Sequence, residues 1–164
     1  MPKKPQLKHK GGTVHIPTKV GEKTHNIEQF LGVHYRALVE QVPAIIYTDS
    51  AEEMFKTLYI NPQLKAITGY EPEEWITDPE LWVRIIHPDD RERVLEEYTR
   101  TYAAKQPSIS EYRITTLDGL IIWVSDETRL VRDKKGKPLF WQGVMVDITW
   151  RKQAEQTQEG WLHC

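Results

Sequence analysis

Three charged side chains are candidates for chemistry. Glu111, Arg113 and Asp126 fall within stretches rich in β-branched and aromatic residues, which are typical of half-buried strands. The two carboxylates could share acid–base work, or the three groups could hold a small polar or aromatic metabolite. Alternatively, Arg113 pairs with a carboxylate and aromatic side chains fill the space. No nucleophile next to a base, no glycine-rich phosphate loop and no set of metal ligands is present, so catalysis is not expected.

Three extended runs carry these residues. Residues 109–116 and 120–132 are separated by Leu117-Asp118-Gly119, and an Asp-Gly pair between apolar runs strongly indicates a hairpin. A second turn, residues 133–137, leads into residues 138–149. The pattern predicts a three-stranded antiparallel meander, and the polar residues after Thr149 predict a helix that follows it directly.

Composition indicates one ordinary globular domain. The chain has 164 residues, of which 39% are hydrophobic and 28% charged, and its one cysteine, Cys164, excludes a disulfide framework. It shows neither a signal peptide nor an apolar run of the roughly 20 residues that span a bilayer, so a cytoplasmic location without a membrane partner is expected. Residues 1–25 are rich in lysine; a disordered basic leader is favoured over a segment that binds nucleic acid or anionic lipid.

Further elements precede the meander. Apolar residues at helical spacing predict an amphipathic helix over residues 27–42, followed by short strands at 44–48 and 57–60. Asn61-Pro62 predicts the cap and first turn of a helix that Gly69 ends. His87-Pro88-Asp89-Asp90 opens the longest helix, which is expected to reach about Lys105.

This order and several local motifs resemble the PAS family with its C-terminal PAC motif, of the sensory-box type. The matching segments are NPQLKAITGY (61–70) with Glu73-Glu74, HPDD (87–90), EYR (111–113), Asp118-Gly119 before Trp123, and Asp-Ile-Thr (147–149). The resemblance implies an α+β, PAS-like (profilin-like) fold, a five-stranded antiparallel sheet with helices on one face. It predicts a PAS domain over 26–149 with an N-terminal flanking helix, and the start of a C-terminal signalling helix at 150–164.

In such a fold a ligand pocket is expected between the sheet and its helices. The two-residue alternation of strands then suggests which side chains face it. The predicted pocket residues are Ile46, Thr48, Ile109, Glu111, Arg113, Val124, Asp126, Trp141, Gly143 and Met145.

The cofactor, if any, stays unknown, but flavin and haem are not expected. Flavin-binding photosensors of this family need a cysteine that residues 70–88 lack, and their polar flavin contacts would fall on Glu111, Val124 and Met145. Haem-binding relatives use a histidine on the long helix, and residues 89–105 contain none. His87 is interpreted as a helix cap, and the six histidines show no metal spacing.

The other face of the last two strands is too apolar to face water. Part of it is expected to lie under the helix 27–42, and the rest to form a homodimer interface. The predicted dimer face comprises Trp123, Gln142, Val144, Val146 and Ile148. The signalling junction is predicted at Asp147, Ile148, Thr149 and Arg151, with two alternatives: Arg151 pairs with Asp147, or Thr149 caps the helix with support from Asp147.

The function expected from this resemblance is a cytosolic signal-transduction module. It would bind a small ligand or a partner and relay the change, as a dimer, to an effector such as a histidine kinase of a two-component system or a diguanylate cyclase. The alternative is a ligand-free interaction and dimerisation module.

Overall fold

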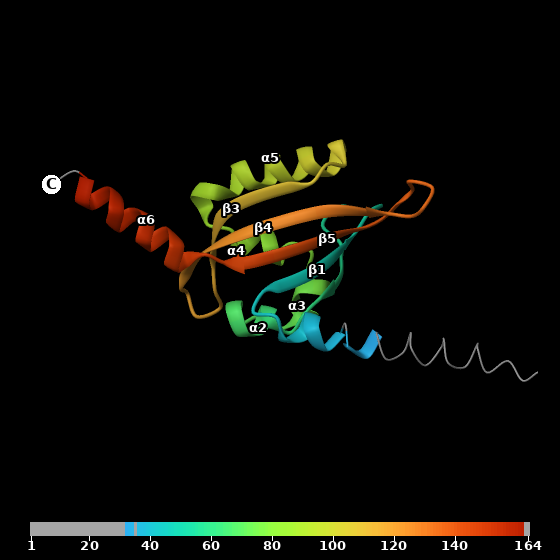
Figure 1. Cartoon of the computed structure of the whole chain (residues 1–164), viewed down its shortest axis with the longest axis horizontal. Coiled ribbons are helices and arrows are strands. Elements are labelled where there is room, and N and C mark those ends of the chain that lie inside the picture. The colour runs from blue at the N-terminus through green and yellow to red at the C-terminus, as the bar shows by residue number, and fades with distance from the viewer. Residues whose placement is uncertain (1–31, 35, 163–164) are drawn as a thin grey trace, which may run out of the picture. The chain divides into compact units, whose positions relative to one another are not determined.

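A computed structural model describes residues 32–34 and 36–162 of the chain. The chain divides into two units, Met1–Tyr35 and Arg36–Cys164, and the description below concerns the second. Its five strands form one antiparallel sheet in the order β2-β1-β5-β4-β3 (Figure 1). The predicted α+β fold with a five-stranded antiparallel sheet is confirmed. The predicted leader, residues 1–25, lies outside the described residues.

The predicted meander consists of β3 (Ser108–Thr115), β4 (Ile121–Arg132) and β5 (Pro138–Asp147). The turns between these strands contain Gly119 and Gly136, whose φ angles are 84° and 83°. Glycine adopts this left-handed conformation without the steric cost of a Cβ atom, which explains why the chain reverses at these two positions. The hairpin prediction is therefore confirmed.

The two short strands β1 (Ile45–Ser50) and β2 (Thr57–Ile60) complete the sheet beside β5. β1 pairs antiparallel with β5, and in this register Tyr47 lies opposite Gly143. Directly paired residues point to the same face of a sheet, so this register decides which residues of β1 face the helices.

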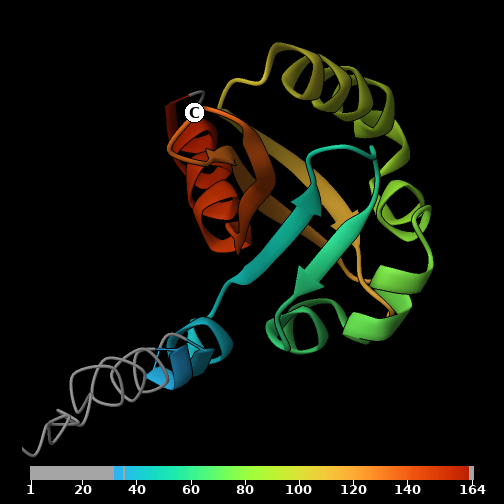
Figure 2. The ribbon, with the colours of Figure 1, turned by 90° about the vertical axis from the view of Figure 1, so that its right-hand side faces the viewer.

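Helices cover one face of the sheet (Figure 2). They are α2 (Gln63–Thr68), α3 (Pro72–Thr77), α4 (Leu81–Ile85) and α5 (Pro88–Ala104). Their apolar side chains pack against the strands in one core, whose fully buried members include Ile45, Leu64, Ile86, Tyr112, Ile114 and Val124. Because this face is covered, we call it the inner face and the opposite one the outer face.

Two predicted helix boundaries are confirmed. Gly69 ends α2 in the left-handed conformation, with φ 84°. His87 precedes α5, where its Nδ1 atom accepts a hydrogen bond of 3.1 Å from the backbone N–H of Asp89. An accepted bond at this place satisfies a donor that the helix itself leaves unpaired, which is the capping role predicted for His87.

The predicted cap at Asn61 is wrong. Its fully buried side chain donates to the carbonyl oxygens of Val39 (2.9 Å) and Ala44 (2.8 Å) and accepts from the N–H of Ile46 (3.1 Å). These backbone groups lie where the chain enters β1 and need partners once they are buried. Asn61 therefore fastens the entry of β1 and makes no side-chain cap on α2.

The N-terminal helix differs from its prediction. Residues 32–34 and 36–41 are helical, whereas 27–31 lie outside the described residues. Leu38 is 61% exposed, and the carbonyl oxygen of Glu40 accepts a bond from Gln63 of α2. Residues 36–41 thus contact the chain around Asn61 and Gln63, with Leu38 in solvent and Val39 half-buried, and no contact of theirs with the outer face supports the predicted covering of that face.

Candidate functional site

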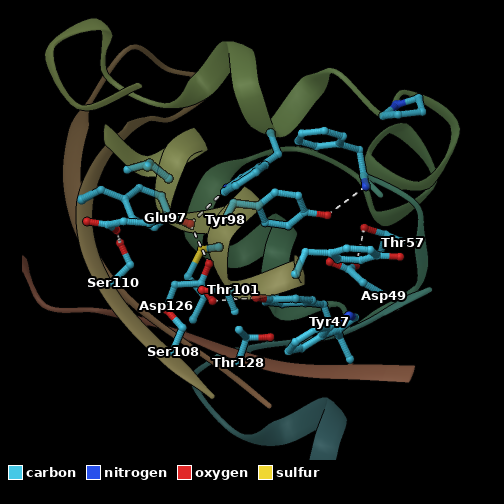
Figure 3. Close-up of a pocket in the computed structure, with 18 of the residues that line it drawn as sticks. Tyr47, Asp49, Thr57, Glu97, Tyr98, Thr101, Ser108, Ser110, Asp126 and Thr128 are labelled. Carbon is cyan, nitrogen blue, oxygen red and sulfur yellow. Dashed lines mark hydrogen bonds between the residues drawn. The ribbon is translucent and has the colours of Figure 1, made fainter. Parts of the chain in front are cut away.

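A cavity of about 80 Å³ lies between the inner face of the sheet and the helices (Figure 3). Side chains from all five strands, from α3, α4 and α5 and from the loops beside them line it. Eight of its 20 described lining residues are aromatic. The aromatic lining residues are Tyr47, Phe55, Trp75, Trp82, Tyr98, Tyr102, Tyr112 and Trp141.

Several of these rings form a chain of contacts along α4, α5 and β5. The ring centroids of Trp82 and Tyr98 are 5.2 Å apart, those of Tyr98 and Tyr102 6.2 Å, and those of Tyr102 and Trp141 5.8 Å. Phe55 stacks on Tyr98 at 4.7 Å, and its N–H donates to the Tyr98 hydroxyl. Such contacts hold the rings in place, so the wall of the cavity is largely pre-formed.

Asp126 is the centre of a buried hydrogen-bond network in the cavity. Its two carboxylate oxygens accept bonds of 2.7 Å from the hydroxyls of Tyr47 and Tyr112. The Tyr112 hydroxyl in turn accepts from the indole N–H of Trp82 at 3.0 Å. Burial raises the pKa of Asp126, while the two tyrosine hydrogen bonds lower it.

Asp49 is a second carboxylate in the same cavity. It accepts a hydrogen bond of 2.8 Å from the hydroxyl of Thr57 on β2. The pKa of Asp49 is raised to about 7, chiefly by burial and to a lesser degree by the charge of Asp126, while the Thr57 bond acts to lower it.

Positive charge is missing from this cavity. Its described lining includes four acidic residues and neither lysine, arginine nor histidine. Two of the acids have cationic partners beside the cavity, since Glu97 pairs with Arg93 and Asp78 pairs with Arg84. Within the described part of the chain, Asp49 and Asp126 have no ion pair.

The ten predicted pocket residues separate into three groups, of which two lie on the inner face. Asp126, Trp141 and Met145 line the cavity. Val124 and Gly143 share their face but do not line it: Val124 is fully buried in the core, and Gly143 lies under the Tyr47 ring.

The other five predicted pocket residues were assigned to the wrong face. On β1, the cavity receives Tyr47 and Asp49 in place of Ile46 and Thr48. On β3, it receives Ser108, Ser110 and Tyr112 in place of Ile109, Glu111 and Arg113. Successive strand residues point to opposite faces, so an error of one residue in the register moves every side chain of the strand.

Arg113 pairs with a carboxylate, as one of the two sequence interpretations held. Its guanidinium donates to both oxygens of Asp90 on α5, at 2.8 and 2.9 Å, and its backbone N–H donates to the same carboxylate. These bonds hold the pKa of Asp90 below its ordinary value. The guanidinium also lies 5.3 Å from the ring centroid of Trp123, a cation–π distance. Arg113 therefore contacts a side chain of the outer face and not the cavity.

Glu111 connects the sheet to the last helix, α6 (Thr149–Leu162). Its Oε2 atom lies 3.0 Å from both Arg151 Nη2 and Lys152 Nζ. The pKa of Glu111 is lowered by the bond from Lys152 and then by that from Arg151. The ammonium of Lys152 also lies 4.9 Å from the ring centroid of Trp123, so cations of α6 contact both β3 and β4.

The start of α6 distinguishes the two alternatives for the junction. Asp147 Oδ1 accepts from the N–H (2.9 Å) and the hydroxyl (2.6 Å) of Thr149, whose oxygen accepts from the N–H of Trp123 at 3.0 Å. Arg151 pairs with Glu111 and Glu155, so the proposed pairing of Arg151 with Asp147 is wrong. Asp147 and Thr149 together fasten the beginning of α6 to the end of the sheet.

The predicted dimer face needs one correction. Trp123, Gln142, Val144 and Val146 lie on the outer face, and Val146 is 39% exposed. Ile148 is only 7% exposed. It follows the end of β5, and its backbone N–H donates to the carbonyl oxygen of Trp123. It therefore offers little surface to a partner. We call Trp123, Gln142, Val144 and Val146 the outer patch.

Apart from Trp141, the sequence predictions assigned none of the aromatic lining residues to the pocket, and they also missed Asp49. The rings on α5 had a usable signal, since Val94, Tyr98 and Tyr102 recur at helical spacing and had to face the sheet. Asp49 follows the predicted strand 44–48 directly, and nothing local distinguishes it from a loop residue. No three His, Cys, Asp or Glu side chains of the described residues are placed to hold a metal ion, and none of the described helices is long and apolar enough to cross a membrane.

Comparison with known proteins identifies the fold. A family model described as the PAS fold matches residues 57–145. The chain is 28% identical over 122 residues to the methyl sulfide methyltransferase-associated sensor of Methanosarcina acetivorans; the match covers 74% of this chain and 12% of that protein. The chain thus spans a small part of this relative's length.

Two solved structures are similar at a TM-score of 0.60. One is the N-terminal domain of a diguanylate cyclase with PAS/PAC sensor from Marinobacter aquaeolei, 28% identical, with 66% of this chain and 98% of that chain covered. The other is a sensory box histidine kinase/response regulator from Burkholderia thailandensis, 26% identical, with 79% and 95% covered.

Proposed function

This chain belongs to the PAS-fold family, and from that premise we propose that it is a sensory module which binds a small ligand in its cavity and relays the change through α6 to an effector. Two of the similar proteins are described as a diguanylate cyclase with a PAS/PAC sensor and a sensory box histidine kinase. These are the effector classes that we propose for the longer protein or partner served by this module. The module itself performs no catalysis in this proposal.

One observation carries the proposal: Glu111, on the outer face of β3, holds Arg151 and Lys152 of α6. The neighbouring residues of the same strand, Ser110 and Tyr112, line the cavity. A ligand that shifts β3 therefore moves the carboxylate that anchors α6. Because the strand is common to both sites, no further element is needed to carry the change.

We expect Glu111→Gln to raise the hydrogen-exchange rates of the backbone amides in α6 by roughly 3- to 10-fold, because the substitution removes the charge that holds the two cations. The free energy of unfolding should change by no more than about 1 kcal/mol, since these ion pairs are partly exposed and screened. Exchange measured by mass spectrometry, with unfolding by urea, checks both expectations.

The matched control is Glu155→Gln. Glu155 also lies near Arg151 and Lys152, at 3.8 and 3.6 Å, but all three belong to α6. Removing its charge leaves the connection to the sheet intact. Equal exchange rates of α6 in the two variants would contradict the role of Glu111 as the anchor.

The proposal includes a homodimer formed by the outer patch. Two further apolar residues of the same face are exposed, Ile109 (69%) and Ile121 (53%), with Glu127 between Ile109 and Val144 in the strand register. Several exposed apolar side chains on one face of a sheet favour an interaction site there. This surface is also what favours the alternative function, a ligand-free dimerisation module.

We expect Val146→Asp to weaken dimerisation at least about tenfold, because it places a charge in an interface that would be desolvated. Sedimentation velocity over a range of concentrations measures the effect. Leu58→Asp is the control. Leu58 is 51% exposed and lies on the edge strand β2, which β1 separates from β5. A wild-type chain that stays monomeric at high micromolar concentration, or a dimer that Val146→Asp leaves intact, would reject this interface.

A further inference from the structure

The cavity combines aromatic rings with two carboxylates that have no cationic partner among the described residues. Asp126 and Asp49 both line it, and their hydrogen-bond partners are the neutral hydroxyls of Tyr47, Tyr112 and Thr57. A buried carboxylate without a counter-charge is costly, so a cation that enters the cavity supplies what the described lining lacks. The faces of aromatic rings attract cations as well.

An anionic ligand does not suit this cavity. Arg113, which was predicted from the sequence to line the pocket, donates its guanidinium hydrogen bonds to Asp90 of α5 and does not line the cavity. Carboxylates and phosphates are normally held by arginine, lysine or backbone N–H groups. The described lining contains no cationic side chain, and two of its carboxylates would repel such a ligand.

The volume limits the size of the ligand. About 80 Å³ gives room for roughly six groups of the size of a water molecule or a methyl group. From this size, the aromatic wall and the two carboxylates, we infer that the cavity binds a small organic ammonium ion, with its charge facing Asp49 and Asp126. This inference rests on the proposed sensory function, since it names the class of ligand that the module would sense.

Cation binding should depend on pH. The titratable groups that face Asp49 are Asp126 on β4, Tyr47 on β1, Tyr112 on β3, and Tyr98 and Tyr102 on α5. Burial raises the pKa of every one of these tyrosines, so they stay neutral in the relevant range. Because the pKa of Asp49 is about 7, affinity for a permanent cation should rise as the pH increases through 7 and the carboxylate ionises.

Choline is a suitable probe because it carries a permanent charge and has about the right size. Its neutral isostere, in which a tert-butyl group replaces the trimethylammonium group, is the matched control ligand. We expect calorimetric titration of the full chain at pH 8 to show choline binding at least tenfold tighter than the isostere. Lowering the pH to 6 should weaken choline binding severalfold and leave the isostere unchanged.

Three variants and one control variant locate the site. Asp49→Asn and Asp126→Asn should each weaken choline binding at least tenfold, whereas Glu92→Gln, which removes an exposed charge on α5, should not. Thr128→Leu fills the cavity without removing a charge, so it should abolish binding of both compounds. Choline affinity that survives Thr128→Leu, or failure of choline to bind the wild-type chain, would overturn the inference.

The outcomes also separate this inference from the proposed function. If the neutral isostere binds as tightly as choline, the cationic ligand class is wrong while a ligand-binding cavity remains. If choline binds with the expected specificity but does not change hydrogen exchange in α6, the ligand class stands and the relay to α6 is wrong.

Discussion

Replacing Gly143 by alanine is expected to lower the free energy of unfolding by about 3 kcal/mol and to abolish ligand binding in the cavity. A Cβ atom at Gly143 would lie 1.9 Å from Cζ of Tyr47 and 2.3 Å from its Cε1 and hydroxyl oxygen. The ring has little freedom to move, because its hydroxyl donates to the buried Asp126. Displacing it would break this bond and change the shape of the cavity wall.

A double-mutant cycle isolates the cause. In a Tyr47→Leu background the distal ring atoms are gone, so adding Gly143→Ala should cost less than about 1 kcal/mol, and the coupling energy should reach about 2 kcal/mol. Urea unfolding measures all four proteins. Gly160→Ala is the control for the substitution itself, because nothing lies within 4 Å of a Cβ atom there, and it should be neutral or slightly stabilising. Additive effects of Tyr47→Leu and Gly143→Ala would reject the contact.

Replacing Asp49 by asparagine is expected to stabilise the protein at pH 8 by roughly 2 to 4 kcal/mol, or about 5 to 10 °C in melting temperature. The pKa of Asp49 rises from 3.8 to about 7 on folding, because burial penalises its charged form. Asparagine is uncharged and can still accept the bond from Thr57. If the carboxylate of Asp49 is retained for ligand binding at a cost in stability, its replacement should both stabilise the fold and weaken cation binding.

The sign of the pH dependence follows from proton binding. Between pH 4 and 7 the folded chain holds a proton on Asp49 that the unfolded chain has released, so the stability contributed by this residue falls as the pH rises through that range. Above pH 7 both states are ionised and the dependence ends. The raised pKa of Asp126 acts in the same direction. The lowered pKa of Asp90 acts in the opposite direction: it stabilises the fold at neutral pH, and this stabilisation is lost as the pH falls and Asp90 is protonated.

Melting temperatures at pH 5 and pH 8 check this expectation. The difference in melting temperature between Asp49→Asn and the wild type should be large at pH 8 and small at pH 5. Glu92→Gln, which also removes one negative charge but at an exposed site, should show no such difference. If the Asp49→Asn protein is no more stable than the wild type at pH 8, the buried charge of Asp49 does not destabilise the folded protein.

The strands, turns and most helix boundaries could be read from the sequence because their causes are local. The hairpin at Asp118-Gly119, the end of α2 at Gly69 and the cap at His87 depend on the conformations and hydrogen bonds of a few neighbouring residues. These features, taken in order along the chain, were sufficient to identify the PAS fold, which the family model confirms.

The candidate site was only partly predictable, because pairing between distant strands decides which side chains meet. The sequence assigned its predicted pocket residues of β4 and β5 to the correct face, and three of them, Asp126, Trp141 and Met145, line the cavity. On β3 the pattern Ser-Ile-Ser-Glu-Tyr-Arg has large and polar residues on both faces, so neither face is marked as buried. There, only the packing of α5 against the sheet determines that Tyr112 points inward and Glu111 outward.

The sequence by itself thus determined the elements, their order and the family of this protein. The tertiary structure alone decided that Glu111 pairs with α6, that Arg113 pairs with Asp90 outside the cavity, and that Asp49 and Asp126 line the cavity without a cationic partner among the described residues. The physical reason is the two-residue period of a strand. A shift of one residue costs little within the strand, but it exchanges the buried and exposed sets of side chains, and only contacts between segments far apart in the sequence distinguish the two arrangements.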